Sequence, residues 1–274
     1  MHEAPVIDLG GFRLDLSVLI MLIVTCAIVF VVAKLATRNL SVENPGKLQN
    51  FMEWAVEFVR NMISSTMDWK KGKPFLSLAM TMIMFIFVAN MLGLPLGIVT
   101  EYHDTEKAKI FGQEITTVTS VLKEQHEKHP GEEAHAEVAW WKSPTADLSV
   151  TMGLALLVFV LSHGLGLFKN TKSYLKHYVQ PYPFFLPINI IEQLSKLLTH
   201  GVRLFANIFA GEVLIGTIMT LAKASVVGAI FSIPLLMVWD GFSIFVGAIQ
   251  SFVFVILMMV YIGQSIESHD EHEH

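Results

Sequence analysis

Cysteine is almost absent from this chain of 274 residues, in which Cys26 is the single one. An intramolecular disulfide is therefore excluded. Charge is also scarce, because Asp, Glu, Lys and Arg make up only 16% of the residues, against about 25% in an average soluble domain. The net charge of −5 comes mainly from one loop and the C-terminal tail, so it gives no indication of a nucleic-acid partner.

Several familiar sequence signals are missing as well. The sequence contains no evident internal repeat, glycine-rich phosphate loop, metal-ligand spacing or nucleophile motif. We therefore expect no cofactor, no metal and no catalytic chemistry. Residues 1–13 contain acids and lack the basic start and cleavage site of a secretory signal, so the first apolar block is expected to remain as an anchor.

Long apolar runs are what the sequence has in abundance, since 53% of its residues are hydrophobic. A helix needs about 20 apolar residues to cross a bilayer, and five blocks meet this requirement: 16–33, 75–99, 148–168, 187–222 and 226–263. The last two are too long for one upright crossing, which predicts a long, strongly tilted helical hairpin. The sequence thus predicts an all-α integral membrane protein with a single membrane domain.

One further helix is predicted between the first two blocks, over residues 48–69. Apolar side chains recur there at helical spacing, including Phe51, Trp54 and Phe58, whereas Glu53 lies elsewhere on the helix. This pattern is typical of an amphipathic helix in the membrane interface. A helix packed on protein at the membrane surface would show the same pattern.

The distribution of basic residues predicts how the chain crosses the membrane. Lysines and arginines flank one side of the first three blocks: Lys34, Arg38, Lys47, Arg60, Lys70, Lys71, Lys73, Lys169, Lys172 and Lys176. The positive-inside rule makes this side cytoplasmic. The N-terminus and the loop 100–147 are then outside, and the polar, histidine-containing tail 265–274 is cytoplasmic.

Arg203 is the most informative residue, because it lies in an otherwise almost wholly apolar stretch. A guanidinium keeps its charge in proteins, and an ionisable group at membrane depth is a candidate functional site. On a helix with 3.6 residues per turn, Asn207 shares the Arg203 face. The alternative is a structural arginine, paired with a carboxylate of the same chain.

Glu212 is nine residues from Arg203 and so lies on roughly the opposite side of the same helix. A carboxylate at membrane depth needs water, another polar residue or a proton, which suits a proton path. A protonated or hydrogen-bonded structural acid is the alternative.

Other polar residues in the apolar blocks are candidates for the same path. Gln250 and Ser243 share a face of the last block approximately, and Asp240 is offset towards its outer end. Glu192 lies at the cytoplasmic end of the fourth block. Each of these residues also has a structural alternative, as a helix cap, a helix–helix bridge or a solvated side chain. Asn90 and His163, which are single polar residues in apolar helices, are expected to make helix–helix contacts.

The run from Arg203 to Glu212, Arg-Leu-Phe-Ala-Asn-Ile-Phe-Ala-Gly-Glu, closely resembles the signature of the a subunit of the F-type ATP synthase, whose usual form has Gly at the place of Ala206. Four other segments resemble the bacterial form of this family: 50–54, 88–93, 140–147 and 242–250. The resemblance covers most of the chain and is carried by all these motifs together.

The resemblance implies the role of each candidate residue. The chain would be the stator of a rotary proton path in a bacterial plasma membrane, with a ring of c subunits and the b-subunit peripheral stalk as partners. Arg203 would face the essential carboxylate of the ring, near Gln250, and separate two aqueous half-channels. Glu212 would belong to the path from the outer face, and Asn207 would line the interface with the ring.

The sequence also departs from the family pattern. Gln193 stands where many relatives carry a second acid after Glu192, and Ser243 stands where some relatives have a histidine paired with the glutamate. Asp240 replaces an uncharged residue and is a candidate to compensate. Two rival functions are a self-contained channel or secondary transporter, which often shows internal repeats, and a non-conducting membrane scaffold.

Overall fold

The computed structural model describes residues 4–93, 99–103, 108–110, 113–128, 135–179 and 182–266. Within them, five helices are long and apolar enough to cross a membrane: α1 (Leu16–Thr37), the segment Trp69–Leu92 that ends in α4 (Leu76–Leu92), the apolar part Leu148–Phe168 of α6 (Leu148–Val179), α7 (Leu186–Ala224) and α8 (Val226–Ile266). The prediction of an all-α membrane fold is confirmed. The structure extends the helix expected over 148–168 by eleven residues, to Val179.

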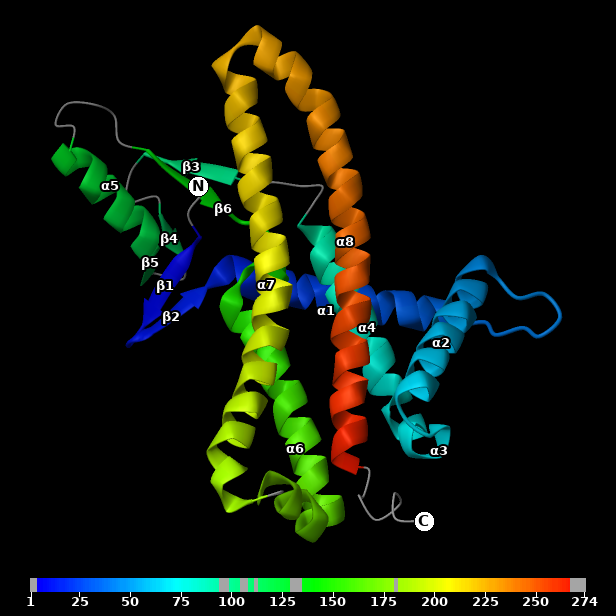
Figure 1. The fold of residues 1–274 in the computed structure, drawn as a ribbon. Coiled ribbons are helices and arrows are strands. Elements are labelled where there is room, and N and C mark those ends of the chain that lie inside the picture. Colours follow the sequence, from blue (N-terminus) through cyan, green and yellow to red (C-terminus); the bar gives the residue numbers. More distant parts are fainter. Residues whose placement is uncertain are drawn as a thin grey trace.

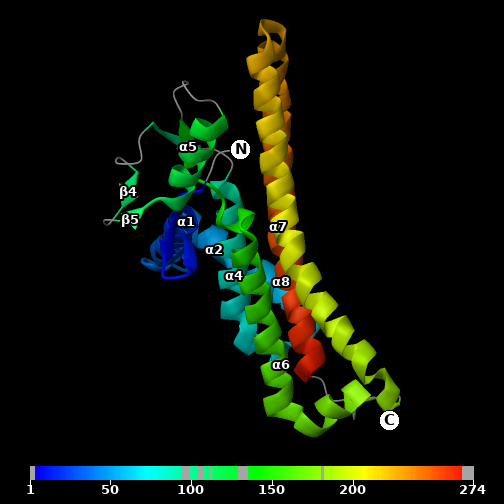
Figure 2. The same ribbon diagram turned by 90° about the vertical axis from the view of Figure 1, so that its left-hand side faces the viewer.

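The last two helices form one long hairpin, with α7 and α8 lying side by side along their length (Figure 1). They have 39 and 41 residues, so each is about 60 Å long, whereas the hydrocarbon core of a bilayer is about 30 Å thick. In Figure 1 α1 runs across the hairpin, and in Figure 2 it is seen nearly end-on. The 22 residues of α1 match one upright crossing, and the inclination of the hairpin in the bilayer stays a prediction.

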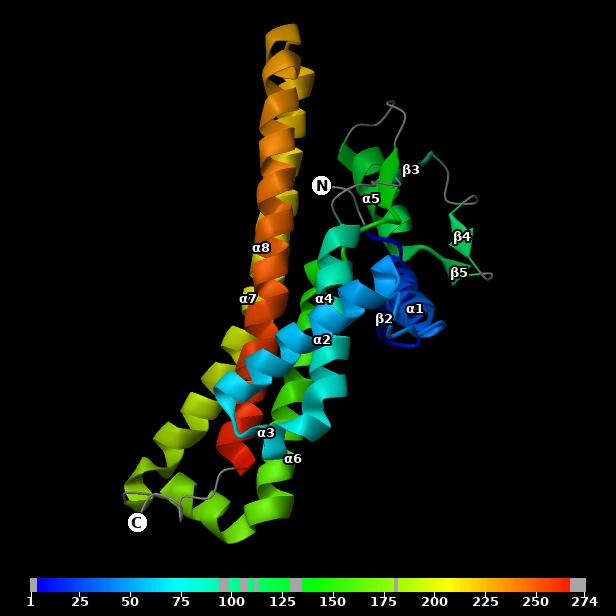
Figure 3. The same ribbon diagram turned by 90° about the vertical axis from the view of Figure 1, so that its right-hand side faces the viewer.

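The main apolar core lies where α2 (Lys47–Thr66), α4, α6 and α8 meet beside the first half of α7. Its largest fully buried side chains come from several of these helices: Val59, Ile63, Ile86, Leu204, Phe254, Met258, Met259 and Ile262. Figure 3 shows α2 running diagonally across α4 and α8. This core fixes α7 and α8 relative to the other helices.

The α2 helix combines the two arrangements that its amphipathic pattern allowed. Its second half packs on protein through Met62 and Ile63, which are buried. Its first half exposes Phe51 and Trp54, and a row of aromatic rings continues from Trp54 through Phe58 to Phe252 of α8. The exposed aromatic side chains suit the membrane interface, where such amphipathic rings are enriched.

The region outside the helices contains a small folded unit that the sequence analysis treated as a loop. Strand β3 (Val99–Tyr102) pairs antiparallel with β6 (Ala136–Ala139), and α5 (Thr116–Lys128) packs against them over a separate apolar cluster. Two other hairpins are β4 (Lys109–Ile110) with β5 (Gln113–Glu114), and β1 (Val6–Leu9) with β2 (Phe12–Asp15). Gly10 and Gly11, both with positive φ, allow the β1–β2 turn.

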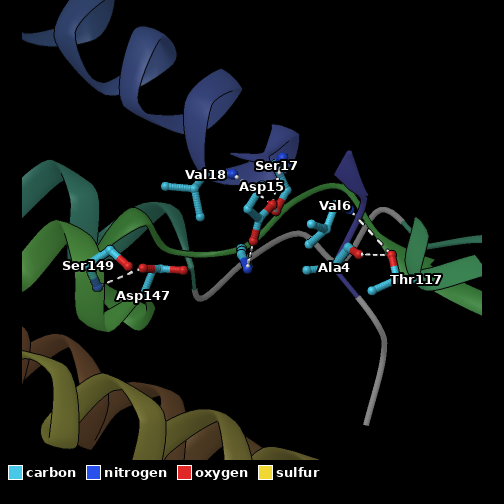
Figure 4. Close-up of polar contacts among 9 residues, drawn as sticks. Ala4, Val6, Asp15, Ser17, Val18, Thr117, Asp147 and Ser149 are labelled. Carbon is cyan, nitrogen blue, oxygen red and sulfur yellow. Dashed lines mark hydrogen bonds and ion pairs between the residues drawn. The ribbon is translucent and has the colours of Figure 1, made fainter. Parts of the chain in front are cut away.

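The N-terminal hairpin is attached to this unit by hydrogen bonds. The Thr117 hydroxyl on α5 donates to the Ala4 carbonyl at 2.5 Å and accepts from the Val6 amide at 3.3 Å (Figure 4). The hairpin runs directly into α1, whose first turn is capped by Asp15. This folded unit and the start of α1 are therefore connected.

Candidate functional site

A pocket opens between α4, α7 and α8, with an empty volume of about 570 Å³ that is partly open to the surroundings. It is lined by Asn90, Gly93, Asn207, Ile208, Ala210, Gly211, Glu212, Ile215, Trp239, Phe242, Ser243 and Val246. Small residues at positions 93, 210 and 211 leave the space, since they lack bulky side chains. Glu212 is the only ionisable side chain among these lining residues.

The pocket gathers polar residues that the sequence had placed on separate helices. Glu212 and Asn207 come from α7, Ser243 from α8 and Asn90 from α4. Asn207, which was expected to share the Arg203 face, thus also reaches the space beside Glu212. Hydroxyl and amide groups around a carboxylate can hold water by hydrogen bonds, so this arrangement can hold water beside Glu212.

Arg203 lies outside this pocket lining and its side chain is exposed on α7. Among the residues that the structure describes, no carboxylate forms an ion pair with its guanidinium. The structural alternative, an arginine paired to an acid of the same chain, has no support in this geometry. A permanent cation exposed on a membrane helix points instead to a negative group on another molecule.

Two candidates on α8 lie differently from Ser243. Gln250 is buried, with 7% of its surface exposed, and does not line the pocket. Asp240 is half-buried and is also absent from the lining, whereas its neighbour Trp239 is present. The position therefore gives no support to the idea that Asp240 compensates for the serine at 243.

Trp239 is a pocket residue that the sequence analysis missed. Its indole nitrogen Nε1 is buried and has no hydrogen-bond partner among the described residues. Buried N–H groups are nearly always paired with protein or ordered water, so the site suits a water molecule. Only the aromatic side chain itself marked this position in the sequence, and that signal is equally common in apolar packing.

Asn90 joins three elements by hydrogen bonds. Its side-chain nitrogen Nδ2 donates to the Gly247 carbonyl of α8 at 3.2 Å, and its Oδ1 accepts from the Thr145 hydroxyl at 2.7 Å. The Ser143 hydroxyl lies 2.7 Å from that of Thr145 and donates to the Ala89 carbonyl at 2.9 Å. Ser143 and Thr145, on the segment before α6, thereby form part of the wall behind the pocket.

His163 makes a contact within its own helix. Its Nδ1 lies 2.9 Å from the Phe159 carbonyl, and its ring lies 3.8 Å from that of Phe159. These contacts fix the side chain on α6, while its expected helix–helix role stays a prediction.

The cytoplasmic candidate Glu192 forms an ion pair with Lys196, one turn later on α7, at 2.8 Å. Both side chains are partly exposed, at 57% for Glu192 and 31% for Lys196. A carboxylate in such an environment can reach water. The Glu192–Lys196 pair lies about two turns before Arg203 along α7.

His200 lies between this ion pair and Arg203, and it is almost completely buried, with 4% exposed. Its ring packs on Phe254 at 3.9 Å and edge-on to Tyr261 at 5.8 Å, both from α8. Its Nε2 has no hydrogen-bond partner among the described residues. The spacing of Lys196, His200 and Arg203 places all three near one helix face, but it does not predict that His200 is buried against α8.

A further charged group acts on the Glu212 carboxylate from outside the pocket lining. Lys142 forms an ion pair with Asp15 at 2.5 Å and also interacts electrostatically with the Glu212 carboxylate. Sequence spacing gave no sign of this arrangement, because 127 residues separate Asp15 from Lys142. Among the residues that the structure describes, no group of three or more His, Cys, Asp or Glu side chains could hold a metal ion.

Comparison with known proteins identifies related sequences across the whole chain. The family described as "ATP synthase A chain" matches residues 18–263. ATP synthase subunit a of Macrococcus caseolyticus is 43% identical over 276 residues, covering 99% of this chain and 99% of the relative. ATP synthase subunit a of Bacillus subtilis is 42% identical over 278 residues, covering 98% and 99%.

Proposed function

The chain belongs to the ATP synthase A chain family, and from this premise we propose how its residues carry protons across the membrane. As a member of this family it is a non-catalytic, multi-pass subunit of the membrane sector of a bacterial ATP synthase. It acts there as the proton-translocating stator and works with the c-ring and the b subunits. The chemistry of ATP lies in other subunits. The resemblance seen in the sequence is thus confirmed.

We propose that Arg203 separates two half-channels and that Glu212 belongs to the outer one. The observation that carries this proposal is the position of the two groups on α7: Arg203 is exposed and lies outside the pocket lining, whereas Glu212 lines the pocket. A proton in the pocket therefore reaches Glu212, while the cation is presented to a neighbouring molecule. The exposed arginine is available to a carboxylate of the c-ring.

Electrostatic interactions explain how this arrangement would couple proton flow to rotation of the c-ring. A ring carboxylate beside Arg203 is favoured in its ionised form, because the opposite charge stabilises it. It therefore releases its proton to one half-channel as it arrives and takes up a proton from the other as it leaves. A fixed cation also repels a free proton, so protons cross only when bound to the ring. Each charge that crosses is worth about 2.3 kcal/mol per 100 mV.

The cytoplasmic half-channel is proposed to begin near Glu192. Its carboxylate is partly exposed and lies on the same helix as Arg203, towards the start of α7. Gln250, which is buried on α8, is proposed to contribute a polar contact near the arginine. Ser243 and Asn207 are proposed to hold water beside Glu212, in place of the histidine that some relatives carry.

We propose that the N-terminus faces outside and the C-terminus the cytoplasm. The lysines and arginines beside the first three apolar blocks support this orientation through the positive-inside rule. It places the folded unit of β3, α5 and β6 outside, beyond the end of α4, where Gly93 lines the Glu212 pocket. The polar tail beyond residue 266 lies outside the described residues.

Glu212→Gln tests the proposed outer path. The glutamine keeps the size of the side chain but cannot exchange a proton, so ATP-driven acidification of inverted membrane vesicles should fall about tenfold or more, as for loss of an essential proton-transfer group. Glu57→Gln, at an exposed position of α2, is the matched control and should leave acidification unchanged. Full acidification by an assembled Glu212→Gln complex would contradict the role of Glu212.

A further inference from the structure

The segment that precedes α6 is fastened to the end of α4 at several points. The Trp141 indole donates to the Leu92 carbonyl at 2.7 Å, and the Ser143 hydroxyl donates to the Ala89 carbonyl at 2.9 Å. Gly93, which lines the pocket, is so close to this segment that an added Cβ would lie 2.7 Å from the Ser143 Cβ. The backbone at Lys142, between Trp141 and Ser143, is therefore fixed beside Gly93, one of the residues that line the Glu212 pocket.

The Lys142 ammonium forms an ion pair with Asp15 at 2.5 Å, and the two side chains are only 22% and 16% exposed. Ion pairs on an open surface contribute little, but the attraction within a mostly buried pair is stronger, because it acts through a less polar medium. The Lys142 charge also acts through space on the Glu212 carboxylate, without an ion pair between the two. Asp15 is thus the direct partner of this cation, and Glu212 is a more distant one.

The two oxygens of the Asp15 carboxylate make different contacts. Oδ1 caps α1 by accepting from the Ser17 amide at 2.9 Å and the Val18 amide at 3.3 Å (Figure 4). Oδ2 binds Lys142. The cap fixes the carboxylate on the first turn of α1, so Asp15 is a rigid anchor for the lysine rather than a mobile surface acid.

We propose that Asp15 is a positioning residue of the outer proton path, which holds Lys142 away from Glu212 so that Glu212 stays free to exchange protons. Without the Asp15 charge, Lys142 loses its ion-pair partner and is drawn towards the Glu212 carboxylate. A glutamate locked in an ion pair takes up protons less readily, so flow through the pocket slows. This inference rests on the proposed role of Glu212.

Asp15→Asn separates the two tasks of Asp15, because asparagine is as good a helix cap as aspartate but carries no charge to hold Lys142. We expect ATP-driven acidification by the complete complex in inverted vesicles to fall about tenfold, the order expected for a misplaced charged contact. The matched control is Asp147→Asn. Asp147 caps the start of α6 through the Ser149 amide at 2.8 Å, in an exposed position.

The decisive variant is the double substitution Asp15→Asn with Lys142→Met. If the freed lysine is the cause of the defect, removing it restores acidification to the rate of Lys142→Met alone. A structural role of Asp15 would not give this rescue. The proposal is overturned if the double variant is as slow as Asp15→Asn, or if Asp15→Asn pumps as fast as Asp147→Asn.

Two further measurements keep the outcome unambiguous. Assembly is followed by co-purification of the c-ring, and Asp15→Ser, which also caps, replaces Asp15→Asn if assembly falls. Failure of both to assemble would give Asp15 a purely structural role and overturn the proposal. Glu212→Gln is measured in parallel: normal pumping there would overturn the proposed function itself, whereas loss there with normal pumping by Asp15→Asn would overturn this inference alone.

Discussion

The side-chain amide of Asn90 on α4 donates to the backbone carbonyl of Gly247 on α8 at 3.2 Å. The glycine makes this approach possible, because a Cβ at position 247 would lie 3.3 Å from the Asn90 Cβ and 3.0 Å from the Met91 Cε. Small residues allow membrane helices to approach closely in this way. The contact ties one wall of the Glu212 pocket to another, so it couples helix packing to the shape of the proton path.

Asn90→Leu should destabilise the subunit by about 1–3 kcal/mol, because it leaves the Thr145 hydroxyl and the Gly247 carbonyl short of a partner. The measurement is the temperature at which the detergent-extracted complex loses this subunit. Thr81→Val on the same helix is the control, since the exposed Thr81 hydroxyl bonds only to the Ser77 carbonyl of its own helix. Equal melting of both variants would contradict the bridging role of Asn90.

Gly201→Ala should force α7 away from α6. An added Cβ would lie 3.2 Å from the Ala155 Cβ and 3.3 Å from the Met152 Cα, and overpacking of this kind costs about 1–3 kcal/mol. Gly216→Ala is the matched control on α7, because nothing lies within 4 Å of its Cβ position and alanine favours a helix. The temperature at which the complex loses this subunit should be lowered by Gly201→Ala and not by Gly216→Ala. A common effect of both would refute close packing at Gly201.

The orientation of the chain predicts which surface positions can be labelled from outside. In a Cys26→Ser background, Ser120→Cys on α5 should react with a membrane-impermeant maleimide in intact cells. Lys70→Cys, on the short helix α3 (Trp69–Gly72), should react only after permeabilisation. Both positions are exposed, so access rather than burial decides the result. The opposite pattern would reverse the proposed topology.

The long helices could be predicted from the sequence because the length of an apolar run is a direct consequence of bilayer thickness. The excess length of the last two runs also indicated a long hairpin, which α7 and α8 form, while its tilt in the bilayer stays a prediction. The end of α6 was harder to predict, since the residues after Phe168 are mostly polar and carry no apolar periodicity. The outer unit was missed because its strands are short, and β3 pairs with β6 across a long stretch of chain.

The candidate site was predictable only in part, for a related reason. Helical geometry separates Arg203 from Glu212 on α7, and the structure agrees in leaving Arg203 outside the pocket that Glu212 lines. Contacts between residues on different helices could not be predicted in this way. Neither Trp239 beside the pocket nor the ion pair of Asp15 with Lys142 follows from spacing, because tertiary packing brings them together.

The account depends most directly on Arg203 as the barrier between two half-channels. The measurement is ATP-driven acidification of inverted vesicles with Arg203→Ala, beside wild type, with assembly checked and passive proton leak measured after the soluble catalytic sector is stripped. The account predicts that an assembled variant loses pumping, with its leak changed because no fixed cation separates the two paths. Undiminished pumping would contradict it and leave Arg203 as a structural charge.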